Sequence, residues 1–439
     1  MTDTIFALAS APGRSGVQVV RLSGPRAGEA LAALTLRPLP RPREAALAAL
    51  RDPATGEAID RGLLLWFPAP ASFTGEDVAE LHLHGGRAVL AAATSALCAL
   101  GLRVAEPGEF ARRAFENGKL DLTEAEAIAD LVDAETSAQR RQALRQMEGA
   151  LGRLYEGWRT RLVRALAHLE ADIDFPDEDL PDGVAPAVAP VLRDLIGEIA
   201  AHLDDGHRGE RLRDGVSIAI LGAPNAGKSS LLNAIARRDV AIVSARAGTT
   251  RDVIEVQLDL GGYPVILADT AGLRDAADEI EQEGIRRARQ RAGSADLKLL
   301  VFDATVPPDA ATLELLDGDA VAVLNKADLA GGVADRVGTA PALPVSAATG
   351  AGLPGLLAAL EARVAERLAG SGAPPLTRAR HRAALEECRD SLERAMAAPL
   401  PELVAEDVRL AARALGRITG RVDVEDLLDV IFRDFCIGK

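Results

Sequence analysis

Three short runs of residues that can bind a nucleotide follow one another in the middle of the chain. They are Gly222-Ala-Pro-Asn-Ala-Gly-Lys-Ser229, Asp269-Thr-Ala-Gly272 and Asn325-Lys-Ala-Asp328. The first is a glycine-bounded loop whose backbone N–H groups can surround phosphates. The second supplies a carboxylate for Mg²⁺, and the third supplies one for a purine base. Because the runs serve different parts of one nucleotide and come in a workable order, together they predict a domain that binds and hydrolyses GTP.

The glycine-bounded loop has a strand before it and a helix after it. Residues 216–221 form an apolar, β-rich run, and residues 230–236 have a helical pattern. Glycine lets the backbone turn inward at both ends of the loop, and the helix N-terminus adds partial positive charge. We therefore expect Lys228 to reach the β- and γ-phosphates and the Ser229 hydroxyl to bind Mg²⁺.

The two downstream runs predict contacts to the metal, the γ-phosphate and the base. Asp269 ends the apolar run 265–268 and fits an Mg²⁺-binding carboxylate, while the Gly272 N–H fits a γ-phosphate contact that makes the next segment a switch. Asp328 can accept both the N1–H and the exocyclic amine of guanine, a bidentate contact that discriminates by roughly 1–3 kcal/mol. We expect Asn325 to tie loops together, Lys326 to lie along the base, and residues 346–348 to form the last loop beside the guanine.

The usual source of catalytic charge is missing from these runs. Ras-like GTPases orient the attacking water with a glutamine after the second run, but Leu273 stands there, and no arginine finger is obvious although Arg251 and Arg274 are near. The Asn225 amide oxygen offers a ligand for a monovalent cation, with backbone carbonyls from residues 244–250. This pattern predicts a potassium ion in place of the arginine finger, and Thr250 as the second hydroxyl on Mg²⁺.

Composition bounds the class of protein. The chain has 439 residues, 48% of them hydrophobic, which favours two or three domains with sizeable cores. No apolar run is long enough to span a membrane, the start of the chain lacks a signal pattern, and Cys98, Cys388 and Cys436 lack metal-ligand spacing, so we expect a cytoplasmic protein. A net charge of −15 argues against a surface that is basic all over. RNA binding would need a local patch, for which residues 136–164 with seven arginines are a candidate, although a solvated helix face is an equal alternative.

Rare residue types point to further positions. The five lysines are Lys119, Lys228, Lys298, Lys326 and Lys439, and the four asparagines are Asn117, Asn225, Asn233 and Asn325. The nucleotide runs hold two members of each set. By the same logic Lys119 and the terminal Lys439 are candidates for functional residues, although a frayed charged end explains the presence of Lys439 equally well. His82 and His84 share one face of a predicted strand, but a metal site there lacks further ligands.

The strands and helices that must position these residues indicate a fold that combines α/β parts with all-α parts. Residues 1–117 read as mixed α/β, with strands at 16–22, 62–67 and 78–84. Residues 118–213 read as helical, with a capping box of Thr123 and Glu126, a long helix over 139–169 and an interruption by prolines over 174–190. Residues 214–372 alternate strands with helices, and residues 373–439 are helical again. The economical fold is a Ras-like P-loop GTPase domain inserted in a helical domain and preceded by an α/β N-terminal domain.

The chain resembles the MnmE (TrmE) family of tRNA modification GTPases nearly from end to end. The runs that carry the resemblance lie at residues 12–16, 65–68, 72–77, 84–86, 107–110, 119–122, 124–131, 174–178, 248–252 and 435–439. The loop over the nucleotide departs from the family at Ser244, Ala245 and Arg246, which matters little because its coordinating groups are backbone carbonyls.

The resemblance implies an activity and a set of partners. It implies an N-terminal domain that binds a reduced folate (5-formyl- or methylene-tetrahydrofolate) and joins a homodimer. It also implies a hetero-oligomer with the FAD protein MnmG (GidA). The pair would add an aminomethyl or carboxymethylaminomethyl group at C5 of wobble uridine in certain tRNAs. A ribosome-assembly or regulatory GTPase with the same nucleotide chemistry is the alternative, although the sequence shows neither a KH clamp nor a second phosphate loop.

The resemblance also assigns residues. It places Glu281, Thr250 and Cys436 at catalytic positions, with a small buried apolar residue as the alternative for Cys436. Folate contacts fall on Arg21, Glu80, Lys119 and Lys439. Mg²⁺ falls on Ser229 and Thr250, and K⁺ on Asn225 and the backbone of Ser244, Arg246 and Thr249. From the motifs and the resemblance together, the expected GTP-binding residues are Gly222, Asn225, Ala226, Gly227, Lys228, Ser229, Ser230, Ser244, Ala245, Arg246, Ala247, Gly248, Thr249, Thr250, Asp269, Thr270, Ala271, Gly272, Asn325, Lys326, Asp328, Ser346 and Ala347.

Overall fold

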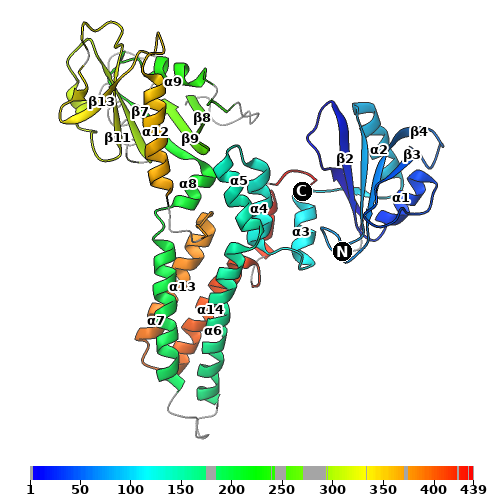
Figure 1. Cartoon of the computed structure of the whole chain (residues 1–439). Helices are drawn as coiled ribbons and strands as arrows, with labels where there is room; N and C mark the ends of the chain where they lie inside the picture. Colours follow the sequence, from blue (N-terminus) through cyan, green and yellow to red (C-terminus); the bar gives the residue numbers. More distant parts are fainter. Residues whose placement is uncertain are drawn as a thin grey trace, which may run out of the picture. The chain divides into compact units, whose positions relative to one another are not determined.

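The computed structural model of the chain contains two compact units (Figure 1). It describes residues 3–174, 184–238, 240–242, 254–269, 293, 295–332, 334–369, 374–422, 425–433 and 435–438. The first unit comprises Met1–Ala129, Gln146–Val188 and Ala397–Lys439, and the second comprises Asp130–Arg145 and Ala189–Met396. Among the described residues, no helix is both long and apolar enough to cross a membrane.

A six-stranded sheet forms the N-terminal part of the first unit. Its strands lie in the order β3-β4-β5-β2-β1-β6, and every neighbouring pair is antiparallel except β1 with β6. Their bounds are β1 Ile5–Leu8, β2 Ser15–Ser23, β3 Ala46–Arg51, β4 Ala58–Phe67, β5 Val78–Gly85 and β6 Arg103–Val104. The three strands expected from the sequence are therefore present as β2, β4 and β5.

The two faces of this sheet differ because successive side chains point to opposite sides. Val20, Leu64 and Leu81 pack with helices α1 (Ala27–Thr35) and α2 (Arg87–Ala99) into one apolar core. The alternate positions form the opposite face, where Arg21 pairs in register with Glu80. The fold thus places two of the expected folate residues side by side on the face that the two helices leave uncovered.

Helices make up the rest of the first unit. They are α3 (Glu109–Glu116), most of α4 (Leu122–Asp133), α6 (Ala150–Asp174), α14 (Pro401–Thr419) and α15 (Glu425–Arg433), and α6 packs along α14. The capping box expected at Thr123 and Glu126 is wrong by two residues. Asp121 Oδ1 accepts from the Glu124 backbone N–H and Glu124 Oε2 accepts from the Asp121 N–H, each over 2.9 Å. Asp121 is the true cap because its carboxylate accepts the N–H three residues on.

The long helix expected over residues 139–169 is two helices. Helix α5 (Ser137–Met147) ends before Gly149, and α6 begins at Ala150. Gly149 has φ +78°, a left-handed conformation that glycine adopts readily and that ends a helix. The expected interruption up to Pro190 is also wrong, because α7 (Val184–Leu203) contains that proline. The helix continues past Pro190 although proline cannot donate an intrahelical hydrogen bond.

A seven-stranded sheet forms the centre of the second unit. Its order is β12-β13-β11-β10-β7-β9-β8, with β13, β11, β10, β7 and β9 parallel and the two outer strands antiparallel. The bounds are β7 Val216–Leu221, β8 Ile254–Leu260, β9 Tyr263–Asp269, β10 Leu297–Asp303, β11 Ala320–Asn325, β12 Arg336–Val337 and β13 Ala340–Pro344. The central strands are apolar on both faces, as a parallel sheet buried between layers requires.

Helices complete the second unit. Helices α9 (Lys228–Ala236) and α12 (Leu353–Leu368) pack on one face of the sheet, and residues near α11 (Ala310–Leu313) pack on the other. Helices α8 (Arg208–Asp214), most of α7 and most of α13 (Ala379–Ala397) also belong to this unit. The chain consists, in order, of an α/β part, helices, a second α/β part and further helices. This order confirms the expected fold class. The four residue ranges assigned as domains stay a prediction.

Candidate functional site

The phosphate loop between β7 and α9 needs glycine at both ends. Gly222 has φ +153° and Gly227 has φ +91°, and a Cβ at either position would collide with a neighbour. At Gly222 the collision would be with the Val301 carbonyl oxygen of β10, and at Gly227 with the Asn325 side chain. Close approach of the loop to two neighbouring strands therefore fixes these glycines.

Functional side chains line the same loop. Lys228 Nζ donates to the carbonyl oxygens of Gly222 and Ala223, each over 2.8 Å, which holds the ammonium group over the loop. Asn225 is exposed and has φ +62°, a conformation that asparagine tolerates better than most residues. Ser229 and Ser230 are exposed in the first turn of α9, where the helix dipole favours anions.

Parallel strands bring the three sequence runs to one edge of the sheet. Asp303 at the end of β10 is in register with Asn325 at the end of β11, and Asp269 at the end of β9 is in register with Ile220 near the end of β7. The carboxyl ends of parallel strands are where α/β sheets bind ligands. The topology thus gathers the three sequence runs, which are predicted to contact phosphate, metal and base, at a single edge.

Asn325 connects the phosphate loop to the last loop beside the base. Its Nδ2 donates to the Ala226 carbonyl oxygen over 2.9 Å, and its Oδ1 accepts from the Ala347 N–H over 3.1 Å. Only 2% of Asn325 is exposed, so these bonds are shielded from water. Ser346 is buried and its hydroxyl accepts from the Thr349 N–H over 3.1 Å, which shapes the same loop.

An ion pair holds the run that is predicted to recognise the base. Lys326 has φ +62°, and its Nζ lies 2.6 Å from Asp303 Oδ2. Partial burial raises the pKa of Asp303, but hydrogen bonds from Lys326 and Thr305 outweigh it and bring that pKa below its ordinary value. Asp328, two residues after Lys326, is exposed. Sequence reasoning missed Asp303, although it ends an apolar strand run just as Asp269 does.

Part of the expected nucleotide site lies outside the described residues. This holds for residues 244–250, for Thr270, Ala271 and Gly272, and for Glu281 and Lys439. Asp269 is described only as the last residue of β9. The potassium carbonyls, the second magnesium hydroxyl and the catalytic glutamate therefore stay predictions.

A second polar site lies on the N-terminal sheet. Arg21 Nε and Nη2 lie 3.1 and 3.0 Å from Glu80 Oε1, so the pair is bidentate from the arginine side. The same guanidinium stands 5.5 Å from the ring centre of Phe73 and 5.8 Å from that of Phe110, within cation–π range. His82 Nε2 lies 3.4 Å from Glu80 Oε2. Sequence reasoning gave no role to the two phenylalanines, although both lie in runs that carry the family resemblance.

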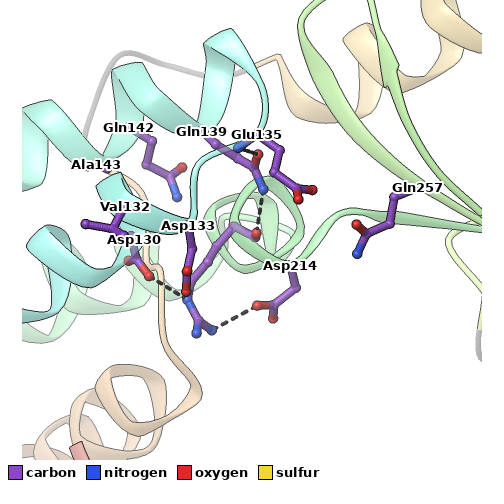
Figure 2. Close-up of a pocket in the computed structure, with 10 residues that line it drawn as sticks. Asp130, Val132, Asp133, Glu135, Gln139, Gln142, Ala143, Asp214 and Gln257 are labelled. Atoms are coloured by element: carbon purple, nitrogen blue, oxygen red, sulfur yellow. Dashed lines mark hydrogen bonds and ion pairs between the residues drawn. The ribbon is translucent and has the colours of Figure 1, made fainter. Parts of the chain in front are cut away.

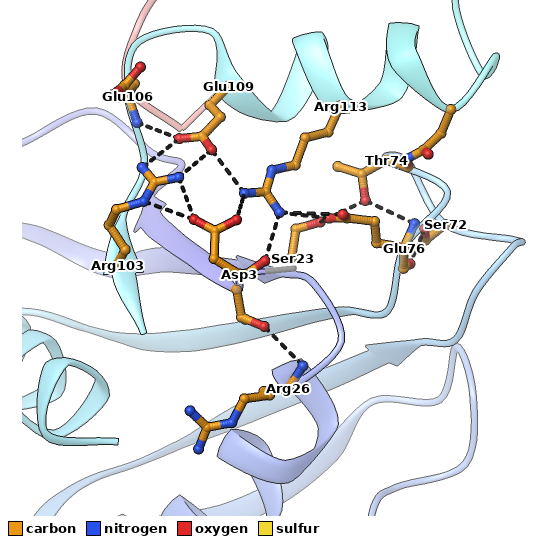
Figure 3. Close-up of polar contacts among 12 residues, drawn as sticks. Asp3, Ser23, Arg26, Ser72, Thr74, Glu76, Arg103, Glu106, Glu109 and Arg113 are labelled. Atoms are coloured by element: carbon orange, nitrogen blue, oxygen red, sulfur yellow. Dashed lines mark hydrogen bonds and ion pairs between the residues drawn. The ribbon is translucent and has the colours of Figure 1, made fainter. Parts of the chain in front are cut away.

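A buried arginine lies among several carboxylates in the N-terminal part of the chain (Figure 3). Arg113 on α3 is 1% exposed and contacts three carboxylates: Asp3 at 2.8 Å, Glu109 at 2.9 Å and Glu76 at 3.2 Å. Arg103 also reaches Asp3 and Glu109, each at 2.7 Å. Hydrogen bonding from Arg103 is the main reason that the pKa of Asp3 lies below its ordinary value. The burial of Arg113 is therefore compensated by paired charge, as a buried guanidinium requires.

The arginine network reaches the loop that carries Phe73. Ser23 Oγ donates to Glu76 Oε2 over 2.7 Å and lies 2.7 Å from Thr74 Oγ1 (Figure 3). Asn117 Nδ2 donates to the Thr74 carbonyl oxygen over 2.8 Å. The loop at residues 72–76 is thus fixed against β2 and α3.

Lys119 lies against the same loop. A Cβ placed on Gly75 would stand 3.3 Å from Lys119 Cε, so the lysine side chain runs beside this glycine. The structure therefore brings Arg21, Glu80 and Lys119 to the surroundings of one loop.

The chain's last described residues also belong to this part: the Gly108 N–H donates to the Cys436 carbonyl oxygen over 3.4 Å, and Ile437 forms a β-bridge with Pro107. Cys436 itself is exposed, so it is not the small buried residue allowed for as the alternative.

The structure also bears on two weaker expectations, the arginine-rich patch and the pair of histidines. The seven arginines at 140, 141, 145, 153, 159, 161 and 164 are divided between α5 and α6, and all but 159 and 161 are exposed. His84 Nδ1 lies 2.8 Å from Asp60 Oδ1 and His82 contacts Glu80, and among the described residues no group of three or more potential ligands is arranged to hold a metal.

Comparison with known proteins covers the whole chain. The family model "MnmE helical domain" matches residues 122–436, and "GTP-binding protein TrmE N-terminus" matches residues 4–119. The tRNA modification GTPase MnmE of Paramagnetospirillum magneticum is 63% identical over 442 residues, and that of Parvibaculum lavamentivorans is 62% identical over 442 residues. Each alignment covers 100% of both chains. Among solved structures, the G domain of the T. maritima FeoB iron transporter is 25% identical and covers 35% of this chain and 99% of its own, with a TM-score of 0.26.

Proposed function

The chain belongs to the MnmE family of tRNA modification GTPases, and from this we propose that it is a potassium-stimulated GTPase that helps to modify wobble uridine. It hydrolyses GTP, as its family does. With an FAD-bearing partner, MnmG, it would add an aminomethyl or carboxymethylaminomethyl group at C5 of that uridine in certain tRNAs. The partner and the position of modification rest on the family resemblance alone.

One observation carries the nucleotide part of the proposal. Asn325 bonds the phosphate loop through Ala226 and the loop at Ala347, and it lies three residues before Asp328. A nucleotide bound across this edge would place its phosphates beside Gly227 and Lys228 and its guanine beside Asp328. The carboxylate of Asp328 is exposed at that edge and can accept two N–H bonds from guanine but not from adenine.

The loop residues fit the two metal ions that we propose. Ser229 and Asp269 offer oxygen ligands of the kind that Mg²⁺ prefers, with Thr250 as the further hydroxyl. The exposed Asn225 offers an amide oxygen at the turn of the phosphate loop, a suitable donor for K⁺ together with the carbonyls of Ser244, Arg246 and Thr249. When bound there, K⁺ supplies positive charge beside the phosphates. In this scheme Lys228 steadies the phosphates, and Glu281 helps to position water.

The N-terminal sheet supports the folate part of the proposal. A pterin ring presents adjacent N–H donors that Glu80 can accept, and the glutamyl tail of a folate carries carboxylates that Lys119 can pair with. Arg21 holds Glu80 in place from one side. We extend the site to Lys439 by family resemblance, and we assign Cys436, which is exposed on the neighbouring segment, a role in the modification step.

The sheet edge supports a homodimer. Leu47 on β3 and Leu63 on β4 lie directly opposite each other, and they are 53% and 45% exposed. Large exposed leucines beside each other on an edge strand and its neighbour are typical of a surface that another chain covers. Exposed arginines on α5 and α6 are our candidates for tRNA phosphate contacts, and a protein that acts on tRNA would work in the cytoplasm.

The decisive experiment measures tRNA nucleosides in cells that lack the gene. We expect the C5 modification of wobble uridine to disappear from mass spectra and to return when the wild-type gene is restored, but not when the Asp328→Asn variant is. Unchanged nucleosides in the deletion strain would refute the proposal and favour a ribosome-assembly or regulatory GTPase.

A further inference from the structure

The loop at residues 72–76 and helix α3 together enclose the guanidinium of Arg21 between two aromatic rings. The loop contributes Phe73 and the helix contributes Phe110, and the ring centres lie 5.5 and 5.8 Å from the guanidinium carbon. Phe73 packs against the buried cluster to which Phe110 belongs. Arg21 in turn lies 3.0 Å from Glu80 Oε1. The position of the loop on the helix therefore affects where the guanidinium is held.

One ion pair joins this loop to the helix. Arg113 lies three residues after Phe110 on α3, and its Nη1 is 3.2 Å from Glu76 Oε2 at the end of the loop (Figure 3). The side chains of Arg113 and Glu76 are 1% and 15% exposed, so solvent screens the pair little. We propose that Arg113 and Glu76 are positioning residues, which fix loop 72–76 on α3 and thereby hold Arg21 in place.

Glu76 is not needed to neutralise Arg113. Asp3 and Glu109 each contact Arg113 and also a second arginine. That arginine is Arg103, so two carboxylates already balance two guanidinium groups. Glu76 is a third carboxylate, and a buried ion pair adds little net stability because desolvation offsets much of the attraction between its charges. The pair formed by Glu76 is therefore better explained by the position that it gives to the loop.

The loop also borders a second residue expected to bind folate. A Cβ on Gly75 would stand 3.3 Å from Lys119 Cε and 3.1 Å from Asn117 Cβ. Asn117 Nδ2 donates to the Thr74 carbonyl oxygen over 2.8 Å. A loop released from α3 would therefore change the surroundings of Lys119 as well as those of Arg21. This positioning role rests on the proposed function only for the identity of the ligand, a reduced folate.

Glu76→Gln tests the proposal because it removes the charge of the pair and keeps the shape of the side chain. We expect the full-length chain to bind 5-formyltetrahydrofolate about fivefold more weakly by calorimetry. Asp3→Asn is the matched control, because it also removes one carboxylate from Arg113 but lies outside the loop. This control should bind folate like the wild type.

A double-variant cycle shows whether the ion pair acts through the ring beside Arg21. Phe73→Leu removes the ring and keeps an apolar side chain against the cluster. Each single change should weaken folate binding, and the double variant Glu76→Gln, Phe73→Leu should bind no more weakly than the weaker single variant. Residues that act as one unit give such non-additive losses.

The Arg21 Nε–H signal in ¹⁵N NMR spectra tests the positioning without any ligand. The signal is assigned by its loss in Arg21→Lys. It should move in Glu76→Gln and stay in place in Asp3→Asn. Glu76→Asp keeps the charge but shortens the side chain by one methylene group, so it should also move the signal, and it replaces Glu76→Gln if that variant does not fold.

A further control comes from the second unit. A cavity of about 470 Å³ there has Gln142, Arg213, Asp214 and Gln257 in its lining (Figure 2). Asp214 Oδ1 accepts from Arg213 Nη1 over 2.9 Å. Asp214→Asn thus removes one carboxylate from an arginine of the other unit, and it should leave folate affinity and the Arg21 signal unchanged.

Several outcomes would overturn the proposal. They are an unmoved Arg21 signal in folded Glu76→Gln, equal changes in Asp3→Asn, which would indicate a general effect of charge, and additive losses in the double variant. A wild-type chain that binds no folate, with an Arg21 signal that still moves only when Glu76 is changed, would refute the folate site and support the positioning role.

Discussion

Lys326 Nζ lies 2.6 Å from Asp303 Oδ2, so an ion pair between neighbouring strand ends holds the run that we assign to base recognition. Lys326 adopts a left-handed backbone conformation, with φ +62°. The pair is partly exposed, and such pairs contribute little to global stability. Its value therefore lies in orienting the recognition run.

Asp303→Asn should weaken guanine nucleotide binding without unfolding the domain. The substitution removes the charge that steadies Lys326, and we expect about 1 kcal/mol, or roughly fivefold, in affinity for GDP. Calorimetry with GDP measures this, with Asp335→Asn, an exposed carboxylate of the same unit, as the matched control. Equal affinities in Asp303→Asn and the wild type would show that the ion pair has no part in binding.

Asn225→Ala should remove potassium stimulation of GTP hydrolysis. We expect the rate in K⁺ to fall by about 10²-fold, the usual effect of removing one group that stabilises developing charge, and the rate in Na⁺ to stay unchanged. The control is Asn233→Ala, an exposed asparagine on α9. If the variant keeps its preference for K⁺ over Na⁺, Asn225 is not a ligand of that ion.

Asp328→Asn should shift base preference from guanine to xanthine. An amide can donate to the C2 oxygen of xanthine, whereas the carboxylate accepts from the amine of guanine. Loss of the bidentate contact should cost roughly 1–3 kcal/mol for GTP, and competition between GTP and XTP measures the exchange. Retained selectivity for GTP would contradict the assignment of the base to Asp328.

Glu80→Gln should weaken binding of a reduced folate while leaving GTP hydrolysis unchanged. The substitution removes the carboxylate that Arg21 holds, and we expect at least tenfold weaker binding of 5-formyltetrahydrofolate by calorimetry. His84→Ala, on the same strand but exposed and paired with Asp60, is the control. The absence of binding heat for the wild type at high folate concentration would reject the folate site altogether.

His202 should make the second unit less stable in mild acid. Burial lowers the pKa of His202 to about 4 from the ordinary 6.5, so between these values the unfolded chain binds a proton that the folded chain does not. Stability therefore falls as the pH drops from about 6.5 to 4 and changes no further from this group below 4. Because His202 keeps part of its surface exposed, we expect about 1–3 kcal/mol.

Urea unfolding at pH 7 and pH 5 measures this effect. The variant His202→Gln should lose less stability between the two pH values than the wild type does. His168→Gln, an exposed histidine on α6, should behave like the wild type. Identical losses in all three chains would assign the acid sensitivity to other groups.

The sequence predicted the parts of the fold that depend on neighbouring residues. The strand, glycine loop and helix around Gly222 and Lys228 follow from local pattern, and so does the order of the α/β and helical parts. Prediction from local sequence patterns failed where two patterns competed for the same helix start. Thr123 and Glu126 have the spacing of a capping box, but so do Asp121 and Glu124, and the actual helix start decided between them.

Contacts between residues that are far apart in the sequence could not be predicted from local patterns. Arg113 on α3 meets Asp3 and Glu76 only because this helix packs against segments far away in the sequence. Asp303 meets Lys326 because β10 and β11 are neighbours in the sheet. The spacing of these residues in the sequence does not indicate that their side chains are in contact. The same holds for the cavity beside Gln142 and Gln257, which emerges only when α5 and β8 are packed in one unit.

The buried guanidinium of Arg113 has a consequence for synthesis on the ribosome. Asp3 precedes its partners Arg103 and Arg113 by about a hundred positions, and Gly438 lies against the backbone of Leu8, more than four hundred positions before it. Such non-local pairings delay folding because a long loop must close before they form. We expect nascent chains halted before residue 103 to stay sensitive to protease in their opening strands.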